Sequence, residues 1–158
     1  MKHFIMFFFT LFSISCICQD LPVKKYNIRS AILPAGVAFF SGATWGLHET
    51  ISHHWGAFHQ RFPKASARYW NPAISWKNKY KDGDFLRGEK FPGSSTIFVS
   101  TTDAKHLLTS LHRTSMFGAG LTITLGEKRP WWHYAINTGI SFFSFSTGFH
   151  TVYTVAFN

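Results

Sequence analysis

The histidine-rich stretch WGLHETISHHWGAFHQ, residues 45–60, contains the residue types needed for metal or acid–base chemistry. It holds four of the nine histidines of the chain and one glutamate. On a helix, Glu49 and His53 are four residues apart and share a face. The zinc-protease pattern H-E-x-x-H is absent, because its second histidine would stand at position 52, where the chain has Ser52. Glu49 and His53 are therefore one candidate pair of metal ligands.

A second candidate pair is Asp103 and His106, which are three positions apart. In di-metal helix bundles, E-x-x-H pairs of the same spacing project inward from facing helices. Together with Glu49 and His53, this pair would supply the ligands of a divalent metal ion. A metal bound in this way would be the cofactor of a hydrolase or an oxidase.

His112 and Arg113 follow on the same predicted helix and extend the candidate site to a polar cluster. Ionisable side chains inside membrane helices are costly and usually mark function. Arg113 would need an acidic partner, which Glu49 or Asp103 could supply. Two interpretations stay open for this cluster: it is catalytic, or it holds the helices together by polar contacts. For most histidines of residues 45–60, a third interpretation is a helix end that water reaches.

Composition favours a membrane protein of one domain. Among the 158 residues, 18% are aromatic and only 15% are charged, whereas a soluble domain carries about 25% charged residues. Residues 1–18 have the charged start and short apolar run of a signal peptide or signal anchor. Both cysteines, Cys16 and Cys18, lie in this segment, so residues 19–158 have no disulfide framework. We expect residues 19–158 to form a single membrane domain.

The apolar segments predict an all-α polytopic membrane helix bundle. Three transmembrane helices are expected at about 33–59, 103–125 and 131–156, with a fourth if the signal is retained. Pro34 suits the first turn of the first helix. Small residues form one face of that helix, and such faces let membrane helices approach closely; they are Gly36, Gly42, Ala43 and Gly46. A β-barrel is the alternative, although residues 45–90 lack the ten-residue alternating strands that it needs.

The loop between the first two predicted helices, residues 61–92, is basic and rich in aromatic residues. Residues 61–90 contain eight Lys or Arg against three Asp or Glu, a net charge of +5. A basic aromatic stretch can bind nucleic acid, but its apolar flanks favour a cytoplasmic loop of an inner-membrane protein that contacts anionic lipid. The candidate contact residues for lipid or a partner protein are Trp70, Trp76, Lys77, Lys79, Tyr80 and Lys81. We therefore expect no nucleic-acid partner.

Two segments of the chain resemble a family of small uncharacterised bacterial integral membrane proteins. The first is WNPAISWKNKY, residues 70–80, which matches W-N-P-x-I-S-W-[KR]-N-K-Y. The second, from PGSS to TDAKH, matches a P-G-S segment followed by T-D-x-x-H. In that family a tyrosine can stand at the position of His54, and an apolar residue at that of His150. The resemblance implies a membrane protein without an assigned activity, and its matched positions include Asn71, Asn78 and Asp103.

Two functions of different classes follow from these patterns. The first is a non-enzymatic membrane component whose basic loop contacts anionic lipid, a partner protein or a second copy of the chain. The second is a membrane-embedded metal-dependent hydrolase or oxidase. They differ in whether the two candidate ligand pairs face one another.

Overall fold

The computed structural model describes residues 25–125 and 128–157. Every helix or strand element assigned in these residues is helical, so the expected all-α fold is confirmed. An isolated antiparallel bridge joins Tyr80 and Glu89. The predicted signal segment, residues 1–18, lies outside the described residues.

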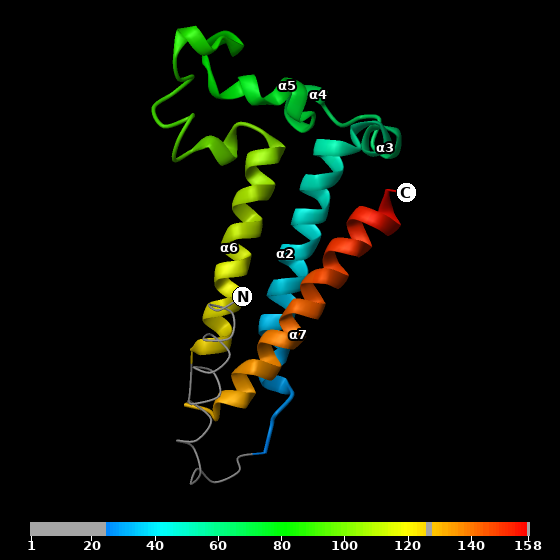
Figure 1. Ribbon diagram of the computed structural model, residues 1–158. Helices are drawn as coiled ribbons and strands as arrows, with labels where there is room; N and C mark the ends of the chain where they lie inside the picture. Colours follow the sequence, from blue (N-terminus) through cyan, green and yellow to red (C-terminus); the bar gives the residue numbers. More distant parts are fainter. Residues whose placement is uncertain (1–24, 126–127, 158) are drawn as a thin grey trace, which may run out of the picture.

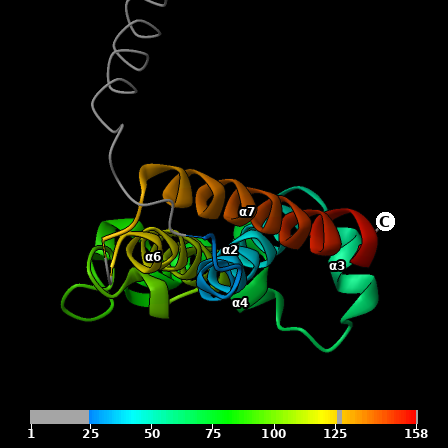
Figure 2. The ribbon, with the colours of Figure 1, turned by 90° about the horizontal axis from the view of Figure 1, so that it is seen from below.

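Three long helices make up most of the molecule: α2 (Arg29–His53), α6 (Ala104–Thr124) and α7 (Trp131–His150). A π-helical turn, η5 (Thr151–Ala156), continues α7. The helix α2 packs along both α6 and α7, whereas α6 and α7 make few contacts with each other. Figures 1 and 2 show α2 as the shared neighbour of the other two helices.

The backbones of α2 and α7 approach one another closely at three glycines. A Cβ atom added to Gly42 would lie 2.0 Å from the carbonyl oxygen of Phe145, and one on Gly148 would lie 2.2 Å from that of Phe39. A Cβ on Gly46 would lie 2.7 Å from the carbonyl oxygen of Phe149. Gly42 and Gly46 are four residues apart, which is the small-xxx-small spacing that lets helices touch in membranes. This part of the expected small-residue face is confirmed.

The first helix begins earlier than Pro34, at Arg29, and Pro34 lies inside it. A proline within a helix leaves the carbonyl four residues before it without its N–H partner. Here that carbonyl belongs to Ser30, and it accepts a hydrogen bond from Asn137 Nδ2 of α7 at 3.5 Å. Asn137 is fully buried and also accepts a hydrogen bond of 2.6 Å from the Tyr26 hydroxyl. A partner on α7 therefore allows α2 to start one turn before its proline.

The first predicted helix, 33–59, is divided in two. The backbone of His54 leaves the helical conformation (φ −128°, ψ 41°), and a short helix α3 (Trp55–Arg61) then runs in a new direction. The helix α3 ends before Pro63, because the residue preceding a proline disfavours helical geometry. The other two predicted helices, 103–125 and 131–156, agree with α6 and with α7 plus η5.

Residues 54–103 form a separate region at one end of the bundle, which we call the head (Figure 1). After α3, its elements are all short: α4 (Ala67–Trp70), α5 (Pro72–Ser75), η1 (Trp76–Lys79), η2 (Lys81–Gly83), η3 (Phe85–Arg87) and η4 (Val99–Thr101). A small apolar core joins the head to the bundle, and its buried members are Ile51, Phe58, Ala104 and Leu108.

The bundle buries small and polar side chains and exposes large apolar ones. On α2, Ser41 and Thr44 are buried while Ile32 and Phe40 are exposed by 66% and 49%. On α7, Phe143 is 72% exposed. By length and composition, α2 is the one helix in the described ranges that is apolar enough to cross a membrane. The expectation of three transmembrane helices is therefore not confirmed, because α6 and α7, with 21 and 20 residues, do not meet this test.

Candidate functional site

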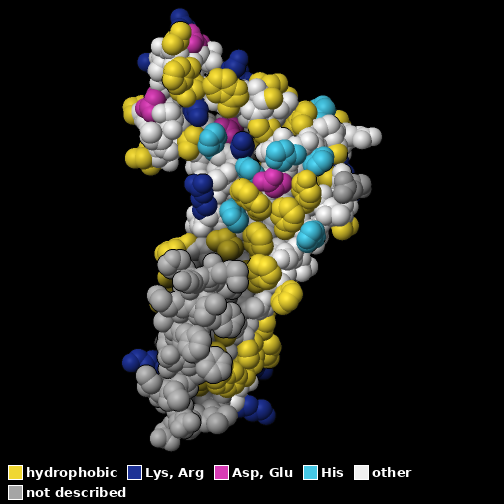
Figure 3. Space-filling view, viewed as in Figure 1, with side chains coloured by type: hydrophobic (Ala, Val, Ile, Leu, Met, Phe, Trp, Pro, Cys, Tyr) yellow, Lys and Arg dark blue, Asp and Glu magenta, His cyan; other side chains and the backbone are white. Residues whose placement is uncertain are grey.

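Histidine side chains gather between the head and the middle of the bundle (Figure 3). Glu49, a member of the first predicted ligand pair, lies near the end of α2 and contacts two histidines. Its carboxylate lies 3.3 Å from His53 Nε2 and 3.1 Å from His48 Nδ1. The His53 side chain is 65% exposed, whereas His48 is almost fully buried at 8%. The pair Glu49–His53 therefore forms as expected for helical residues four apart, and His48 joins it.

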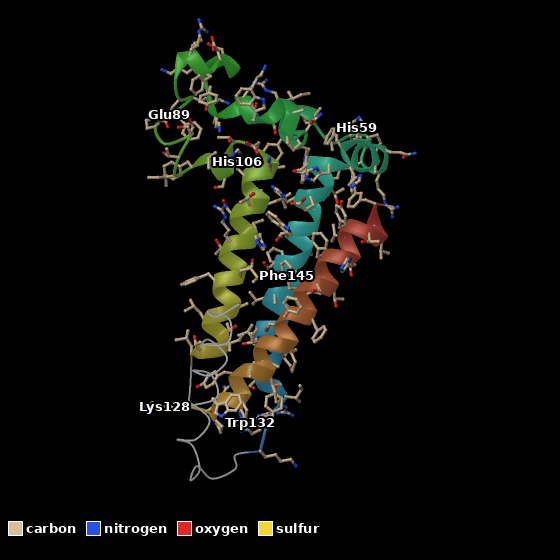
Figure 4. All side chains as sticks on the ribbon, in the orientation of Figure 1. His59, Glu89, His106, Lys128, Trp132 and Phe145 are labelled. Atoms are coloured by element: carbon tan, nitrogen blue, oxygen red, sulfur yellow. The ribbon has the colours of Figure 1, made fainter. Side chains whose placement is uncertain are left out.

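The second predicted pair lies at the start of α6, directly below the head, where His106 is labelled in Figure 4. Asp103 is the N-cap of α6 and accepts a 3.0 Å hydrogen bond from the backbone N–H of His106. Its second carboxylate oxygen lies 2.6 Å from His106 Nδ1 and accepts a 3.2 Å hydrogen bond from Thr102. Asp103 is 1% exposed. This aspartate therefore starts the helix and orients the imidazole at the same time.

The pKa of Asp103 reflects two opposed effects. Burial raises the pKa of the carboxyl group, but the hydrogen bonds from His106 and Thr102 and the charge of His106 outweigh burial and lower it below 3.8. Asp103 is thus held as a carboxylate at neutral pH. Its acceptor capacity is largely used by these local donors.

The two predicted ligand pairs form two separate contacts. Glu49 contacts the histidines of its own helix, and Asp103 contacts His106. Within residues 25–125 and 128–157, no group of three or more His, Cys, Asp or Glu side chains is arranged to hold a metal ion. The structure therefore does not bring Glu49, His53, Asp103 and His106 into one four-ligand site.

The polar contact between α2 and α6 is made by residues that the sequence patterns had not grouped together. The Trp45 indole stacks on the His48 ring with centroids 4.5 Å apart, and its centroid lies 4.7 Å from that of His112. Ser41 Oγ lies 2.9 Å from His112 Nδ1 and donates to the His112 carbonyl at 3.1 Å. Ser41, Trp45 and His48 are separated by four and three residues, and this helical spacing is the signal that could have identified them.

Arg113 has no acidic partner within the described part of the chain. Glu49 and Asp103, its two predicted partners, are engaged with histidines. Arg113 is exposed on α6, and only His112 of the predicted polar cluster faces α2. The expected cluster is therefore smaller than predicted, and it consists of hydrogen-bonded and stacked rings between two helices.

Two of the remaining histidines of the stretch are exposed, as expected for a helix end that water reaches. His54 Nε2 lies 2.9 Å from the Tyr153 hydroxyl of η5, and His59 stacks on Trp55 with centroids 5.3 Å apart. His150, which the sequence places deep in the last helix, is exposed and lies 3.3 Å from Thr154 Oγ1. Of these contacts, the one between His54 and Tyr153 joins the break before α3 to η5.

The predicted contact residues of the basic loop divide into inner and outer ones. Trp70 packs on Phe58, with ring centroids 5.3 Å apart, and so belongs to the core that joins head and bundle. Trp76 is 42% exposed, and the Lys77 ammonium lies 5.7 Å from its ring centroid. The neighbouring pair has the same form, with the Lys79 ammonium 5.4 Å from the Tyr80 ring centroid. Lys81 is exposed beside them.

Side chains of the two motif segments bond to the backbone and close the head. Asn78 Nδ2 donates to the carbonyl oxygens of Arg68 and Thr102, at 2.6 and 3.1 Å. Ser94 is fully buried, donates to the Lys79 carbonyl at 2.7 Å, and accepts from the backbone N–H of Lys90 at 3.1 Å. The first segment is thereby fastened to the second and to the start of α6. These positions have a structural role in the head.

Glu89 is a second example of this local bonding (Figure 4). Its carboxylate accepts hydrogen bonds from the Ser95 hydroxyl and from the backbone N–H of Gly93. These two donors lower the pKa of Glu89 below 4.5. The carboxylate therefore remains charged at neutral pH and offsets part of the basic charge of the loop.

Comparisons with family models, with curated proteins and with solved structures find no match to this chain. The functional assignment therefore depends on the geometry described above.

Proposed function

We propose that this chain is a small multi-pass membrane protein in which α2, α6 and α7 cross the bilayer. The distribution of side chains carries this proposal. Large apolar side chains such as Phe117 and Phe143 are 69% and 72% exposed, whereas the contacts between helices use Ser41, Gly42 and Asn137. Contiguous exposed apolar surface marks contact with lipid or protein, and small and polar residues are typical of helix contacts in membranes.

Helix lengths support the same proposal. The 25 residues of α2 span about 38 Å at 1.5 Å per residue, and the 21 residues of α6 about 32 Å. A hydrocarbon core is about 30 Å thick. A membrane-spanning helix can carry polar side chains if a neighbouring helix supplies their hydrogen-bond partners. Here α2 supplies such partners for His112 of α6 and for Asn137 of α7. Each helix is therefore long enough to cross.

The head would lie on the cytoplasmic face of the bacterial inner membrane. It carries eight Lys or Arg residues between 61 and 90, and cytoplasmic loops are enriched in such residues. Because α2 enters the head and α6 leaves it, this placement fixes the orientation of all three helices. The test is a pair of topology reporters fused after residue 85, one active only in the cytoplasm and one active only in the periplasm. The cytoplasmic reporter should be active if the proposal holds, and activity of the periplasmic reporter would overturn this orientation.

In the proposed function, the head binds anionic lipid, as part of a non-enzymatic membrane component. Exposed apolar side chains stand beside its lysines, among them Trp76, Phe85 and Leu86, the last exposed by 88%. Such a surface inserts rings and aliphatic side chains at the headgroup level while the ammonium groups meet phosphates. A partner protein or a second copy of the chain is the other occupant that this surface would suit.

The test is a dye attached to a cysteine at position 85, in a chain whose own Cys16 and Cys18 are replaced by serine. In nanodiscs of phosphatidylglycerol, the dye should report an apolar environment. When Lys77, Lys79 and Lys81 are replaced by Gln, the dye should report an aqueous environment. Each lysine near an anionic surface contributes about 1 kcal/mol. The matched control replaces three basic residues of the opposite end, Lys25, Arg29 and Lys128, and should have no effect. Equal dye signals in phosphatidylcholine and phosphatidylglycerol would exclude anionic lipid and leave a protein partner as the occupant.

A further inference from the structure

An apolar groove of about 690 Å³ lies where the head meets the end of α7. It is lined by Leu47 of α2 and Val152 of η5, and by the rings of Phe58, Phe62 and Trp70 of the head. Ligand pockets have volumes of about 300–1,000 Å³ and mostly apolar linings. The groove has the size and the surface of a ligand site.

The groove exists because two helices depart from regular geometry at the same level. The break at His54 turns α3 away from the axis of α2 and places Phe58 and Phe62 beside Phe157, the residue after η5, with ring centroids 5.7 and 6.1 Å away. On the other side, α7 changes to a π-helix over Thr151–Ala156. Single π-helical turns are frequent at functional sites.

Two cations belong to the lining of the groove. Arg61 at the end of α3 and Lys64 just after Pro63 both line it, and both are exposed. Neither has an ion-pair partner within the described part of the chain, and no acidic residue lines the groove. An occupant with an apolar body and an anionic end would satisfy both features.

We propose that the groove binds one acyl chain of an anionic phospholipid, with the phosphate held by Arg61 and Lys64. The inference rests on the proposed membrane location of the bundle, which places this end of the helices at the headgroup level. A small soluble anion would leave the apolar lining unused, and an apolar peptide would leave both cations without a partner. A phospholipid fills both parts of the site, with a charge-assisted hydrogen bond from Arg61 as the strongest contact.

The experiment uses the full chain in mild detergent with phosphatidylglycerol that carries a photoreactive group at the end of one acyl chain. Labelling should map to the groove, at residues such as Leu47 and Val152. Ala156→Trp places an indole in the groove and should lower labelling about tenfold, which corresponds to about 1.4 kcal/mol. The matched control Ala135→Trp adds the same side chain at an exposed position of α7 outside the groove and should leave labelling unchanged.

The charge requirement is tested separately with Arg61→Gln and Lys64→Gln together. This variant should lose at least about tenfold in affinity for phosphatidylglycerol, the effect of losing a single charge-assisted hydrogen bond, and should no longer prefer it to phosphatidylcholine. The head variant with Lys77, Lys79 and Lys81 replaced should retain the groove labelling. Labelling spread evenly over the exposed faces of α6 and α7, or transfer of the label to a second chain, would overturn the proposal.

The experiments distinguish a failure of the lipid-binding proposal for the groove from a failure of the proposed function. If the chain is recovered in the soluble fraction of cells, the membrane location fails, whatever the labelling in detergent shows. If the chain stays in the membrane and the head dye responds to anionic lipid, but Ala156→Trp does not lower labelling, only the groove proposal fails.

Discussion

In the bundle, helix backbones touch directly at Gly42 and Gly148, whereas in the head the chain is held by side chains that bond to its own carbonyl groups. The first kind of contact depends on close packing and needs no water. The second satisfies backbone groups of a segment that has little regular structure of its own. The two regions therefore differ in what each tolerates: added volume damages the bundle, and lost hydrogen bonds damage the head.

The largest effect is expected from Gly42→Ala. Its new Cβ would lie 2.0 Å from the carbonyl oxygen of Phe145, so α2 and α7 must move apart. We expect a loss of about 3 kcal/mol of unfolding free energy, at the upper end for overpacking. Thermal unfolding in detergent, followed by circular dichroism, measures it. The matched control is Gly36→Ala on the same helix, where a Cβ meets nothing within 4 Å. Equal melting temperatures for the two variants would contradict the close contact.

The next effect is expected in the head, from Ser94→Ala. It removes the donor to the Lys79 carbonyl and the acceptor for the Lys90 N–H in a buried position. Leaving buried polar groups unpaired costs about 2 kcal/mol. Limited proteolysis should then cut the head faster, while the melting of the helices stays unchanged. Ser100→Ala, at a serine without a side-chain hydrogen bond in the described residues, is the control. Equal cleavage rates for both variants would show that the serine does not close the head.

The start of α6 illustrates what the sequence could predict. Asp103 is a good capping residue three positions before a histidine, and both the cap and the Asp103–His106 contact are local. The end of α3 before Pro63 is equally local. By contrast, the start of α2 at Arg29 depends on Asn137, which is 107 positions away from Ser30. The burial of His48 likewise depends on Trp45 and on a facing helix. The spacing of residues along the chain does not reveal which distant residues become neighbours. The predicted four-ligand site therefore combined two pairs, Glu49–His53 and Asp103–His106, that the fold keeps separate.

Asp103→Asn tests the junction between the two regions. The amide can still cap α6 but loses the charged contact with His106, which should cost about 1 kcal/mol, the difference between charged and neutral hydrogen bonds. Because the pKa of Asp103 is lowered in the folded protein, its contribution is present above pH 3.8 and is lost as the pH falls through the folded pKa. The difference in unfolding free energy between the two proteins should therefore become smaller as the pH falls from 7 to 3. A constant difference over this range would contradict the assignment.

The smallest effect is expected from Ser41→Ala, which removes the hydrogen bond between α2 and α6 at His112. Polar contacts between membrane helices contribute about 0.6 kcal/mol on average, far less than the loss expected for the glycine contact between α2 and α7. The measurement is again thermal unfolding in detergent, with Ser146→Ala on α7 as the control, since that serine makes no side-chain hydrogen bond in the described residues. A loss as large as that of Gly42→Ala would mean that the α2–α6 contact depends on its polar groups. The bundle would then resemble the head in what holds it together, and the contrast between the two regions would be lost.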